Sequence, residues 1–590
     1  MSAGLSERVK DHLRKIYPDT DLDYLAKQVL EHFRPPCNAL EGKPFGSGSP
    51  HWSQEDMVLI TYANSVVEPD QRPLETLCRF LKQYLESVFS IIHILPFFPF
   101  SSDDGFAVMD YYKVNPDVGE WKDIACIADR FRLMSDLVVN HTSSRSGWFE
   151  NFKKGLDPGK NYYVTANPGD DLSKVVRPRT SPLLNEIQTP AGPRYVWCTF
   201  SHDQVDLDFK NPDVLLEFIS IIRYYLDKGV QVFRLDAIAF LWKEINTTCL
   251  HLAQTHEIIK LFRTLLQARF PHALLITETN VPSKENISYL GNGDQAHVIY
   301  NFPLPPFLLN TLITGNSELL VTWLESLPET PPGATFLNFI ASHDGIGLRP
   351  VEGYFSAKQL DRLIDCMKSF GGRISTRALN DHECNPYEIN ISLWDALKGT
   401  WKNGPDQFQL QRFICAHAVM LCLKGIPAFY IHSILGTKND YHRRDNLQSN
   451  RAVNRHIWEY DLLRHELDSS HSHHHQVFYN LTRIVGIRKT QQAFHPDAEQ
   501  RVYDMGSQLV AVKRTAGSGQ GMEIQTLFCI HNISDRIANI WASVLPPFCR
   551  RLYGTDLITG KSISLDREIF LTPYQFMWIR LEKRACSTTR

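Results

Sequence analysis

Short hydrophobic segments recur along the chain, and four of them end in ionisable side chains. Residues 133–141, 230–240, 273–280 and 336–347 are rich in Leu, Ile, Val and Phe, a composition typical of buried strands. A charged group at the end of a buried strand is costly unless it is paired or has a function there. The pattern therefore predicts four strands whose ends carry chemistry.

Helical segments alternate with the predicted strands. The predicted helices are 74–88, 214–229, 256–270 and 413–425, and three further strands are predicted at 57–63, 89–100 and 426–431. Recurring strand–helix units predict the α/β class, and eight of them close a (β/α)8 TIM barrel. The carboxyl ends of barrel strands form one face, so Asp236, Glu278 and Asp344 are expected to meet in one pocket.

The rest of the chain predicts additions to this barrel. The expected division is an N-terminal helical extension over 1–50, a catalytic barrel over 51–494 and an all-β C-terminal domain over 495–590. For the first segment, a helical cap on the barrel is favoured over a partner-docking extension. Two long insertions, about 143–210 and about 348–412, are expected to cover the pocket, since function concentrates in long βα loops.

Composition narrows the function classes. The 590 residues are 43% hydrophobic and 22% charged with a formal net charge of −3, which gives no indication of nucleic-acid or membrane partners. The twelve cysteines form no CxxC pair, so reduced thiols in a cytoplasmic protein are expected. The first residues lack the apolar core of a signal peptide, and no apolar run is long enough to span a membrane.

An ordered set of motifs resembles a known family. Asp136 with Asn140-His141, then Arg234-x-Asp236, Glu278 and His343-Asp344, resemble the four signature regions of the α-amylase superfamily. Segments 95–111, 177–183, 233–244, 341–347, 386–390 and 450–455 are similar to the sucrose phosphorylase subfamily. The resemblance runs from about residue 50 to the C-terminus and is strongest to the branch that acts on glucosylglycerate.

The three carboxylates suit retaining glucosyl transfer, in which one carboxyl group attacks the sugar and another handles the proton. Arg234 lies two residues before Asp236 on the same strand face and is expected to lower the Asp236 pKa; a purely structural ion pair is the lesser alternative. Apolar surroundings are expected to raise the pKa of Glu278. The resemblance implies that Asp236 is the nucleophile, Glu278 the general acid/base and Asp344 the third carboxylate, which binds sugar hydroxyls.

The resemblance also implies a closed glucose pocket. Asp103 and Arg451 correspond to the ion pair at its far end, and His141 and His343 to ligands of glucose hydroxyls. Phe106 corresponds to an aromatic platform beside the sugar, with plain barrel packing as an equal alternative. The implied substrate-binding residues are Asp103, Phe106, His141, Arg234, His343 and Arg451.

Phosphorolysis additionally requires a cation for phosphate. By resemblance, Arg179 matches a position implicated in this role, and Tyr387 and Glu388 match a mobile lid segment that contributes to phosphate and acceptor binding. Sucrose phosphorylases usually carry Tyr-Gln at the lid pair, so Glu388 departs from them and is similar to the glucosylglycerate branch. A glycerate carboxylate needs its own cation, and Arg177, Arg179 and Arg377 all remain candidates.

The expected reaction is conversion of glucosylglycerate and phosphate to α-D-glucose 1-phosphate and D-glycerate through a covalent glucosyl-enzyme. The expected partners are a small sugar substrate and inorganic phosphate, without cofactor, with a homodimer as a possible assembly. Asn140 stands where calcium-binding amylases place a ligand, but the subfamily implies no metal. Alternatives are phosphorylases of sucrose, sucrose 6-phosphate or glucosylglycerol, then a hydrolase or transglucosidase, and last a catalytically inactive binding protein.

Overall fold

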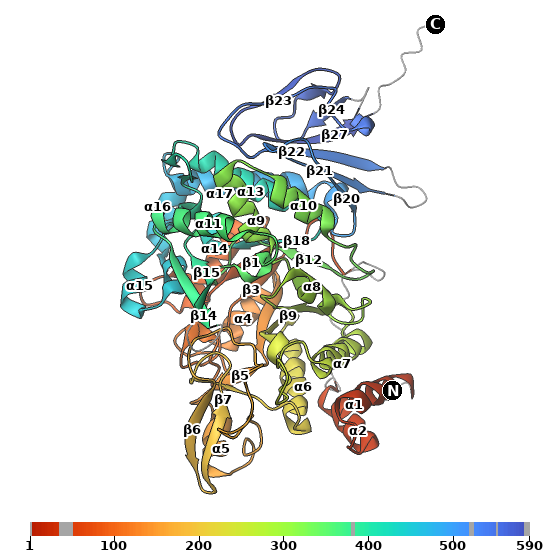
Figure 1. Ribbon diagram of the computed structural model, residues 1–590, viewed down its shortest axis with the longest axis vertical. Coiled ribbons are helices and arrows are strands. Elements are labelled where there is room, and N and C mark those ends of the chain that lie inside the picture. Colours follow the sequence, from red (N-terminus) through yellow and green to blue (C-terminus); the bar gives the residue numbers. More distant parts are fainter. Residues whose placement is uncertain (1–2, 35–50, 379–383, 518–523, 550–552, 583–590) are drawn as a thin grey trace.

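The computed structural model describes residues 3–34, 51–378, 384–517, 524–549 and 553–582. A central barrel lies between a β-sheet at one end of the molecule and a small subdomain at the other (Figure 1). Residues 35–50 of the predicted N-terminal extension lie outside the described residues.

Eight parallel strands close the barrel in the order β1-β18-β12-β11-β10-β9-β4-β3, which confirms the predicted (β/α)8 fold. The strands are β1 (Val58–Thr61), β3 (Ile91–Ile94), β4 (Arg132–Val138), β9 (Val230–Asp236), β10 (Leu274–Thr277), β11 (Val298–Tyr300), β12 (Thr335–Asn338) and β18 (Ile426–Tyr430). Strand β11 was not predicted. It has only three residues, too few to form a distinct apolar run, and no ionisable cluster follows it.

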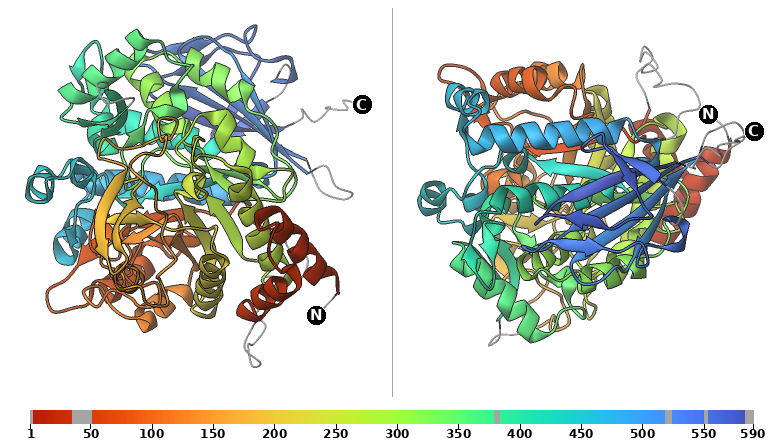
Figure 2. Two further views of the ribbon diagram at one scale, coloured as in Figure 1. Left: turned by 60° about the horizontal axis from the view of Figure 1, so that its bottom comes forward. Right: turned by 90° about the horizontal axis from the view of Figure 1, so that it is seen from above.

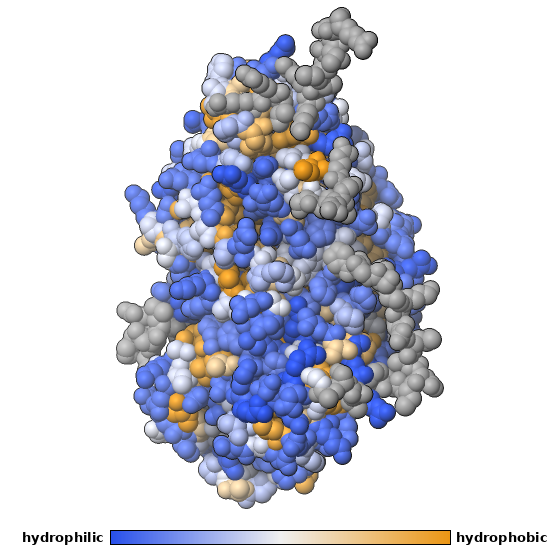
Figure 3. Space-filling model, turned by 90° about the vertical axis from the view of Figure 1, so that its right-hand side faces the viewer, coloured by the Kyte–Doolittle hydropathy of each residue, from blue (hydrophilic) through white to orange (hydrophobic). Residues whose placement is uncertain are grey.

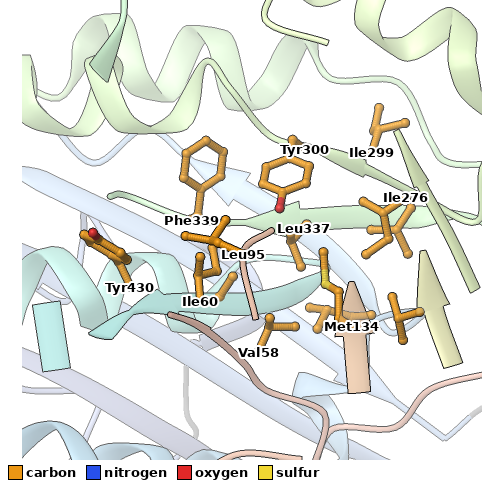
Figure 4. Packing of buried hydrophobic residues seen from close by; sticks show 14 of the residues in the cluster. Val58, Ile60, Leu95, Met134, Ile276, Ile299, Tyr300, Leu337, Phe339 and Tyr430 are labelled. Atoms are coloured by element: carbon orange, nitrogen blue, oxygen red, sulfur yellow. The ribbon is translucent and has the colours of Figure 1, made fainter. Parts of the chain in front are cut away.

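Aliphatic side chains fill the barrel interior, where strands distant in sequence meet (Figure 4). Val58, Ile60, Met134, Ile276 and Leu337 are at most 2% exposed. Full burial of such a side chain stabilises the fold by roughly 1.5–3 kcal/mol. The parallel register, for example Val58 opposite Ile91, brings all the carboxyl ends to one rim.

Helices surround the barrel, and their ends follow local sequence signals. In α6 (Pro212–Asp227), the Asn211 side chain accepts a hydrogen bond from the Asp213 amide, and Pro212 occupies the first turn. Gly229 then adopts φ 92°, which lets the chain turn into β9. The other helices on the barrel are α3 (Pro73–Phe80), α4 (Trp121–Ala128), α7 (Ala253–Arg269), α8 (Ser283–Ile287), α9 (Leu304–Thr314), α10 (Glu318–Ser326), α13 (Gln409–Cys422), α14 (Ile431–Ile434), α15 (Tyr441–Leu447), α16 (Tyr460–Asp468) and α17 (His473–Lys489).

The helix predicted over 74–88 is shorter than expected. Helix α3 ends at Phe80, and a π-helical turn continues over Leu81–Leu85. Both segments bury leucines against the barrel, so their apolar residues form one continuous helical pattern in the sequence. The pattern therefore predicted a single helix.

The two N-terminal helices, α1 (Ala3–Ile16) and α2 (Leu22–His32), lie beside α7 and α6 (Figure 2). Val9 and Leu13 are fully buried. His12 Nδ1 lies 2.6 Å from Glu257 Oε1 of α7, and the Tyr17 hydroxyl donates to the Phe209 carbonyl at 2.7 Å. These contacts fix the two helices to the outside of the barrel.

Two groups of elements interrupt the barrel on the carboxyl side of its strands. After β4 come β5 (His141–Ser143), α5 (Gly147–Lys154), the hairpin β6 (Leu184–Thr189) and β7 (Gly192–Trp197), and β8 (Gln204–Asp206). After β12 come β13 (Ile346–Gly347), the 3₁₀ turn Arg349–Val351, α11 (Ala357–Ser369), β14 (Arg373–Ala378), β15 (Cys384–Asn390) and α12 (Leu393–Ala396). Strands β13, β15 and β14 form an antiparallel sheet in that order, which we call the lid sheet.

The C-terminal part is an antiparallel sheet with its own apolar core. Its order is β20-β21-β22-β27-β24-β25, and the strands are β20 (Glu499–Tyr503), β21 (Leu509–Ala516), β22 (Gln525–Asn532), β24 (Tyr553–Asp556), β25 (Ser562–Ser564) and β27 (Phe576–Glu582). Phe528, Ile530 and Ile579 are fully buried in this part.

The face of the molecule in Figure 3 is mainly hydrophilic, with apolar residues in scattered patches. In the described part of the chain, we find no helix with the length and apolar character needed to cross a bilayer.

Candidate active site

The predicted carboxylates meet in one cavity at the carboxyl ends of the barrel strands. Asp236 ends β9, Glu278 directly follows β10, and Asp344 lies in the loop after β12. All three line the cavity. Of the other predicted site residues, Asp103, Phe106, His141, Arg179, Arg234, His343, Tyr387 and Arg451 also line it.

Arg234 is the centre of the charge network around the nucleophile candidate. Its Nη1 donates to Asp136 and, at 2.7 Å, to Asp236 Oδ1, while Nη2 lies 4.0 Å from Glu278 Oε2. Asp136 also accepts from His93 Nε2 at 2.7 Å. Arg234 is 2% exposed, and its hydrogen bonds hold Asp136 and Asp236 in place. Asp236 and Glu278 both lie near this guanidinium, an arrangement that can serve a reaction in which one carboxylate attacks and the other transfers a proton.

Burial changes the acidity of both carboxyl groups. Desolvation raises the pKa of Asp236, and Glu278 raises it further, although Arg234 lowers it. The predicted low pKa of Asp236 is therefore wrong. Desolvation likewise raises the pKa of Glu278. Arg234 lies 2.7 Å from Asp236 Oδ1 and 4.0 Å from Glu278 Oε2, so its charge favours the ionised form of Asp236 more than that of Glu278.

Asp344 has a different environment. Burial would raise its pKa, but Arg451, His343 and Arg455 together hold the pKa below its usual range. Arg451 Nη1 lies 2.6 Å from Asp344 Oδ1. This carboxylate is therefore ionised and held in place by Arg451, whereas burial raises the pKa of Glu278.

One predicted contact of the glucose pocket and one predicted residue of the acceptor site differ in the structure. Arg451 pairs with Asp344 and, through two hydrogen bonds of 2.9 and 3.0 Å, with Glu388; within the described residues no ion pair joins it to Asp103. Asp103 instead accepts from Gln204 Nε2 at 3.4 Å. Glu388 is 3% exposed and lies behind Arg451, outside the cavity lining, so the geometry does not offer its carboxylate to an acceptor.

Aromatic and imidazole groups form another wall of the cavity. Phe106 stacks on His343 with ring centroids 5.1 Å apart and an interplanar angle of 6°, and it also faces the cavity. His141 Nε2 lies 2.9 Å from the Phe106 carbonyl. His343 Nδ1 is buried and has no hydrogen-bond partner in the described part of the chain, and burial lowers the pKa of both histidines. Neutral imidazoles of this kind can bind sugar hydroxyls.

A lysine occupies the polar cluster around Asn140. Lys243 Nζ donates to Asn140 Oδ1 at 2.5 Å and lies 2.7 Å from Asp206 Oδ2. Lys243 is 6% exposed, and Asp206 also accepts from Thr199. The side-chain oxygens of Asn140 and Asp206, which could otherwise bind a metal ion, are thus bound to the ammonium group of Lys243.

The candidate acceptor arginines separate by position. Arg179 lies with its guanidinium carbon 5.6 Å from the Phe200 ring centre and 5.7 Å from that of Tyr387, at the cavity. Arg377 donates to Glu352 Oε1 at 2.8 Å, and neither Arg377 nor Arg177 lines the cavity.

The sequence prediction missed Arg349, which lines the cavity five residues after Asp344. The sequence contained a signal for this residue. Arg349 lies two residues after the predicted strand 336–347, between the apolar residues Leu348 and Val351, so its charge falls in a segment expected to be buried. Gln204, which holds Asp103, was also missed, and nothing in its local sequence distinguishes it.

The fold and a family model identify the type of barrel. Residues 82–328 match the model described as "Alpha amylase, catalytic domain". The crystal structure of sucrose 6F-phosphate phosphorylase from Thermoanaerobacter thermosaccharolyticum superposes with a TM-score of 0.70 at 24% identity, covering 83% of this chain and 96% of that one. The protein is thus built on a barrel of the α-amylase type.

Curated relatives narrow the family. Glucosylglycerate phosphorylase of Escherichia coli (strain K12) is 39% identical over 98% of this chain and 100% of its own length. The glucosylglycerate phosphorylase of Spirochaeta thermophila is 40% identical over 91% of each chain, and sucrose phosphorylase of Agrobacterium vitis is 28% identical over 76% of this chain and 91% of its own. The chain belongs to the glucoside phosphorylases of the α-amylase superfamily, enzymes that transfer glucosyl groups.

Proposed function

We propose that this enzyme converts glucosylglycerate and phosphate to α-D-glucose 1-phosphate and D-glycerate, with retention at the anomeric carbon. The observation that carries the proposal is a cavity lined by the three carboxylates and by two arginines, Arg179 and Arg349, that have no carboxylate partner among the described residues. The similarity over nearly the whole chain to glucosylglycerate phosphorylases supports the same choice. Free thiols among the described cysteines agree with a cytoplasmic location, which is part of the proposal.

In the first half-reaction, Asp236 attacks the anomeric carbon and Glu278 protonates the glycerate oxygen that leaves. Arg234 holds Asp236 at 2.7 Å, and the Ala237 amide donates to Glu278 Oε2 at 3.0 Å, so both groups are oriented before substrate binds. Asp344 carries a fixed negative charge that stabilises positive charge developing on the sugar.

In the second half-reaction, a phosphate oxygen attacks the glucosyl-enzyme and Glu278, now ionised, removes the phosphate proton. The bond between Asp236 and the sugar breaks, and glucose 1-phosphate forms with the original configuration. Phosphate enters from the face that glycerate has left, next to Glu278, so it must outcompete water at that point.

The test is an acceptor screen with glucose 1-phosphate as donor. We expect glycerate to exceed fructose, fructose 6-phosphate and glycerol by at least about tenfold in kcat/KM, which corresponds to about 1.4 kcal/mol. In the other direction, glucose 1-phosphate should be released only when phosphate is present. Preference for fructose would identify a sucrose phosphorylase, and phosphate-independent release of glucose would identify a hydrolase.

A further inference from the structure

Arg349 is a buried cation that lines the active-site cavity and has no ion-pair partner among the described residues. It begins the 3₁₀ turn Arg349–Val351 that follows β13, and it is 8% exposed. Its Nε is buried and unbonded, and among the described residues no carboxylate lies within ion-pair distance of its guanidinium. Burial and the nearby Arg377 lower the pKa of Arg349, while the charges of Glu352 and Glu285 raise it, and a guanidinium remains charged at neutral pH.

A comparison of the four arginines that line the cavity shows which charges are uncompensated. Arg234 is paired with Asp136 and Asp236, and Arg451 with Asp344 and Glu388. Among the described residues, Arg179 has no carboxylate partner and donates to the carbonyl of Pro178. Two positive charges therefore face the cavity without a carboxylate, in the described part of the protein. Since buried charges are normally paired, the missing counterion is expected to come from the ligand.

The wall that carries Arg349 also adjoins the general acid. Asn280, two residues after Glu278, approaches the chain so closely that a Cβ added to Gly347 would lie 2.7 Å from Asn280 Oδ1. That same Oδ1 is buried without a donor and lines the cavity. On the other side, the Leu348 amide donates to the Tyr387 carbonyl at 2.9 Å, and the Tyr387 ring lies beside Arg179. The acceptor side of the cavity thus offers two cations and one unused amide oxygen.

We propose that Arg349 binds the anionic group of both acceptors: the carboxylate of glycerate in one half-reaction and phosphate in the other. This inference rests on the proposed function and adds to it the residue that selects anionic acceptors. In a retaining enzyme the leaving and the attacking oxygen occupy the same position beside the general acid, so one anion site serves both. The planar guanidinium fork fits the two oxygens of a carboxylate or phosphate, and Asn280 Oδ1 can accept from a glycerate hydroxyl.

The experiment compares Arg349→Gln with a matched control, Arg377→Gln. Arg377 lies in the lid sheet and is already paired with Glu352 outside the cavity lining. The donor is α-glucosyl fluoride, whose leaving group needs no anion site, and the acceptors are glycerate, phosphate and the neutral analogue glycerol. For Arg349→Gln we expect kcat/KM for glycerate and for phosphate to fall at least about 50-fold, mainly through KM, while transfer to glycerol falls less than about threefold. Arg377→Gln should keep the wild-type ratio of glycerate to glycerol transfer.

Two results would overturn the inference. One is an unchanged ratio of glycerate to glycerol transfer in Arg349→Gln, and the other is an equal loss with all three acceptors, which would indicate a structural role. Failure of the proposed function gives a different result: the wild-type enzyme itself would then prefer fructose or glycerol to glycerate. In that case the phosphate measurement alone decides whether Arg349 is an anion-binding residue.

Discussion

The substitution Glu388→Gln tests whether the lid sheet is held by its buried ion pair with Arg451. Glu388 lies in β15 and makes two hydrogen bonds to Arg451, at 2.9 and 3.0 Å, while being 3% exposed. Glutamine retains the shape and one acceptor oxygen but loses the charge and the second acceptor. Since a hydrogen bond to a charged group contributes about 1.5–3 kcal/mol, we expect local stability to fall by about 2 kcal/mol.

This free-energy difference has a local readout. Because every 1.4 kcal/mol is a factor of ten, opening of the lid sheet should become about 30-fold more frequent. Hydrogen exchange followed by mass spectrometry should show this acceleration in peptides covering β14 and β15, with the barrel strands unchanged. Catalytic efficiency should also fall, because Arg451 holds Asp344 at 2.6 Å.

The matched control is Glu352→Gln in the same insertion. Glu352 pairs with Arg377 at 2.8 Å, but its side chain is 45% exposed, so the pair contributes only about 0–1 kcal/mol. Exchange in β14 and β15 should then change less than about fivefold. Equal acceleration in the two variants, or none in Glu388→Gln, would refute the reasoning that burial makes the Glu388–Arg451 pair strong.

Three further predictions concern the catalytic carboxyl groups. Asp236→Asn should lower turnover by roughly four or more orders of magnitude with a native circular dichroism spectrum, because no covalent intermediate can form; near-normal activity would exclude Asp236 as nucleophile. Glu278→Gln should impair glucosylglycerate cleavage far more than that of α-glucosyl fluoride, which needs no protonation; equal losses would show that Glu278 is not the proton donor. Because burial raises the pKa of Glu278, cleavage of glucosylglycerate should be retained below that pKa and lost as the pH rises through it, with the alkaline limb above the ordinary carboxyl range of about 4.3. Glu278→Gln should abolish this limb, and its persistence in the variant would assign it to another group.

Much of the barrel could be predicted from the sequence because buried strands alternate with amphipathic helices. Seven of its strands coincide with runs of β-branched and other apolar residues, whereas Val298–Tyr300 is too short to form such a run. The predicted strands extended beyond the observed ones. Residues after β3, for example Phe97 and Phe98, are as buried as the strand itself although they lie outside the barrel sheet. A run of hydrophobic residues therefore indicates which residues are buried, but it does not indicate where the hydrogen bonding of a strand ends.

The active site was predicted as a set of residues but not as a set of contacts. The strand-end positions of Asp236 and Glu278 follow from barrel geometry alone. The partner of Arg451 does not, because Glu388 comes from a lid strand whose position relative to the barrel depends on long-range packing. The low pKa expected for Asp236 failed for a related reason. Arg234 is visible two residues away in the sequence, whereas the desolvation that outweighs it depends on the whole cavity.

The ammonium group of Lys243 has a consequence for the chemical environment in which this enzyme works. Lys243 joins Asn140, after β4, to Asp206 in β8, so it ties the first insertion to the barrel. A hard metal ion bound by the same oxygens would exchange with solution, where phosphate competes as an oxygen ligand. A cation on a covalent side chain cannot be withdrawn in this way. The contact between the first insertion and the barrel through Lys243 is therefore independent of the concentration of phosphate, the proposed substrate.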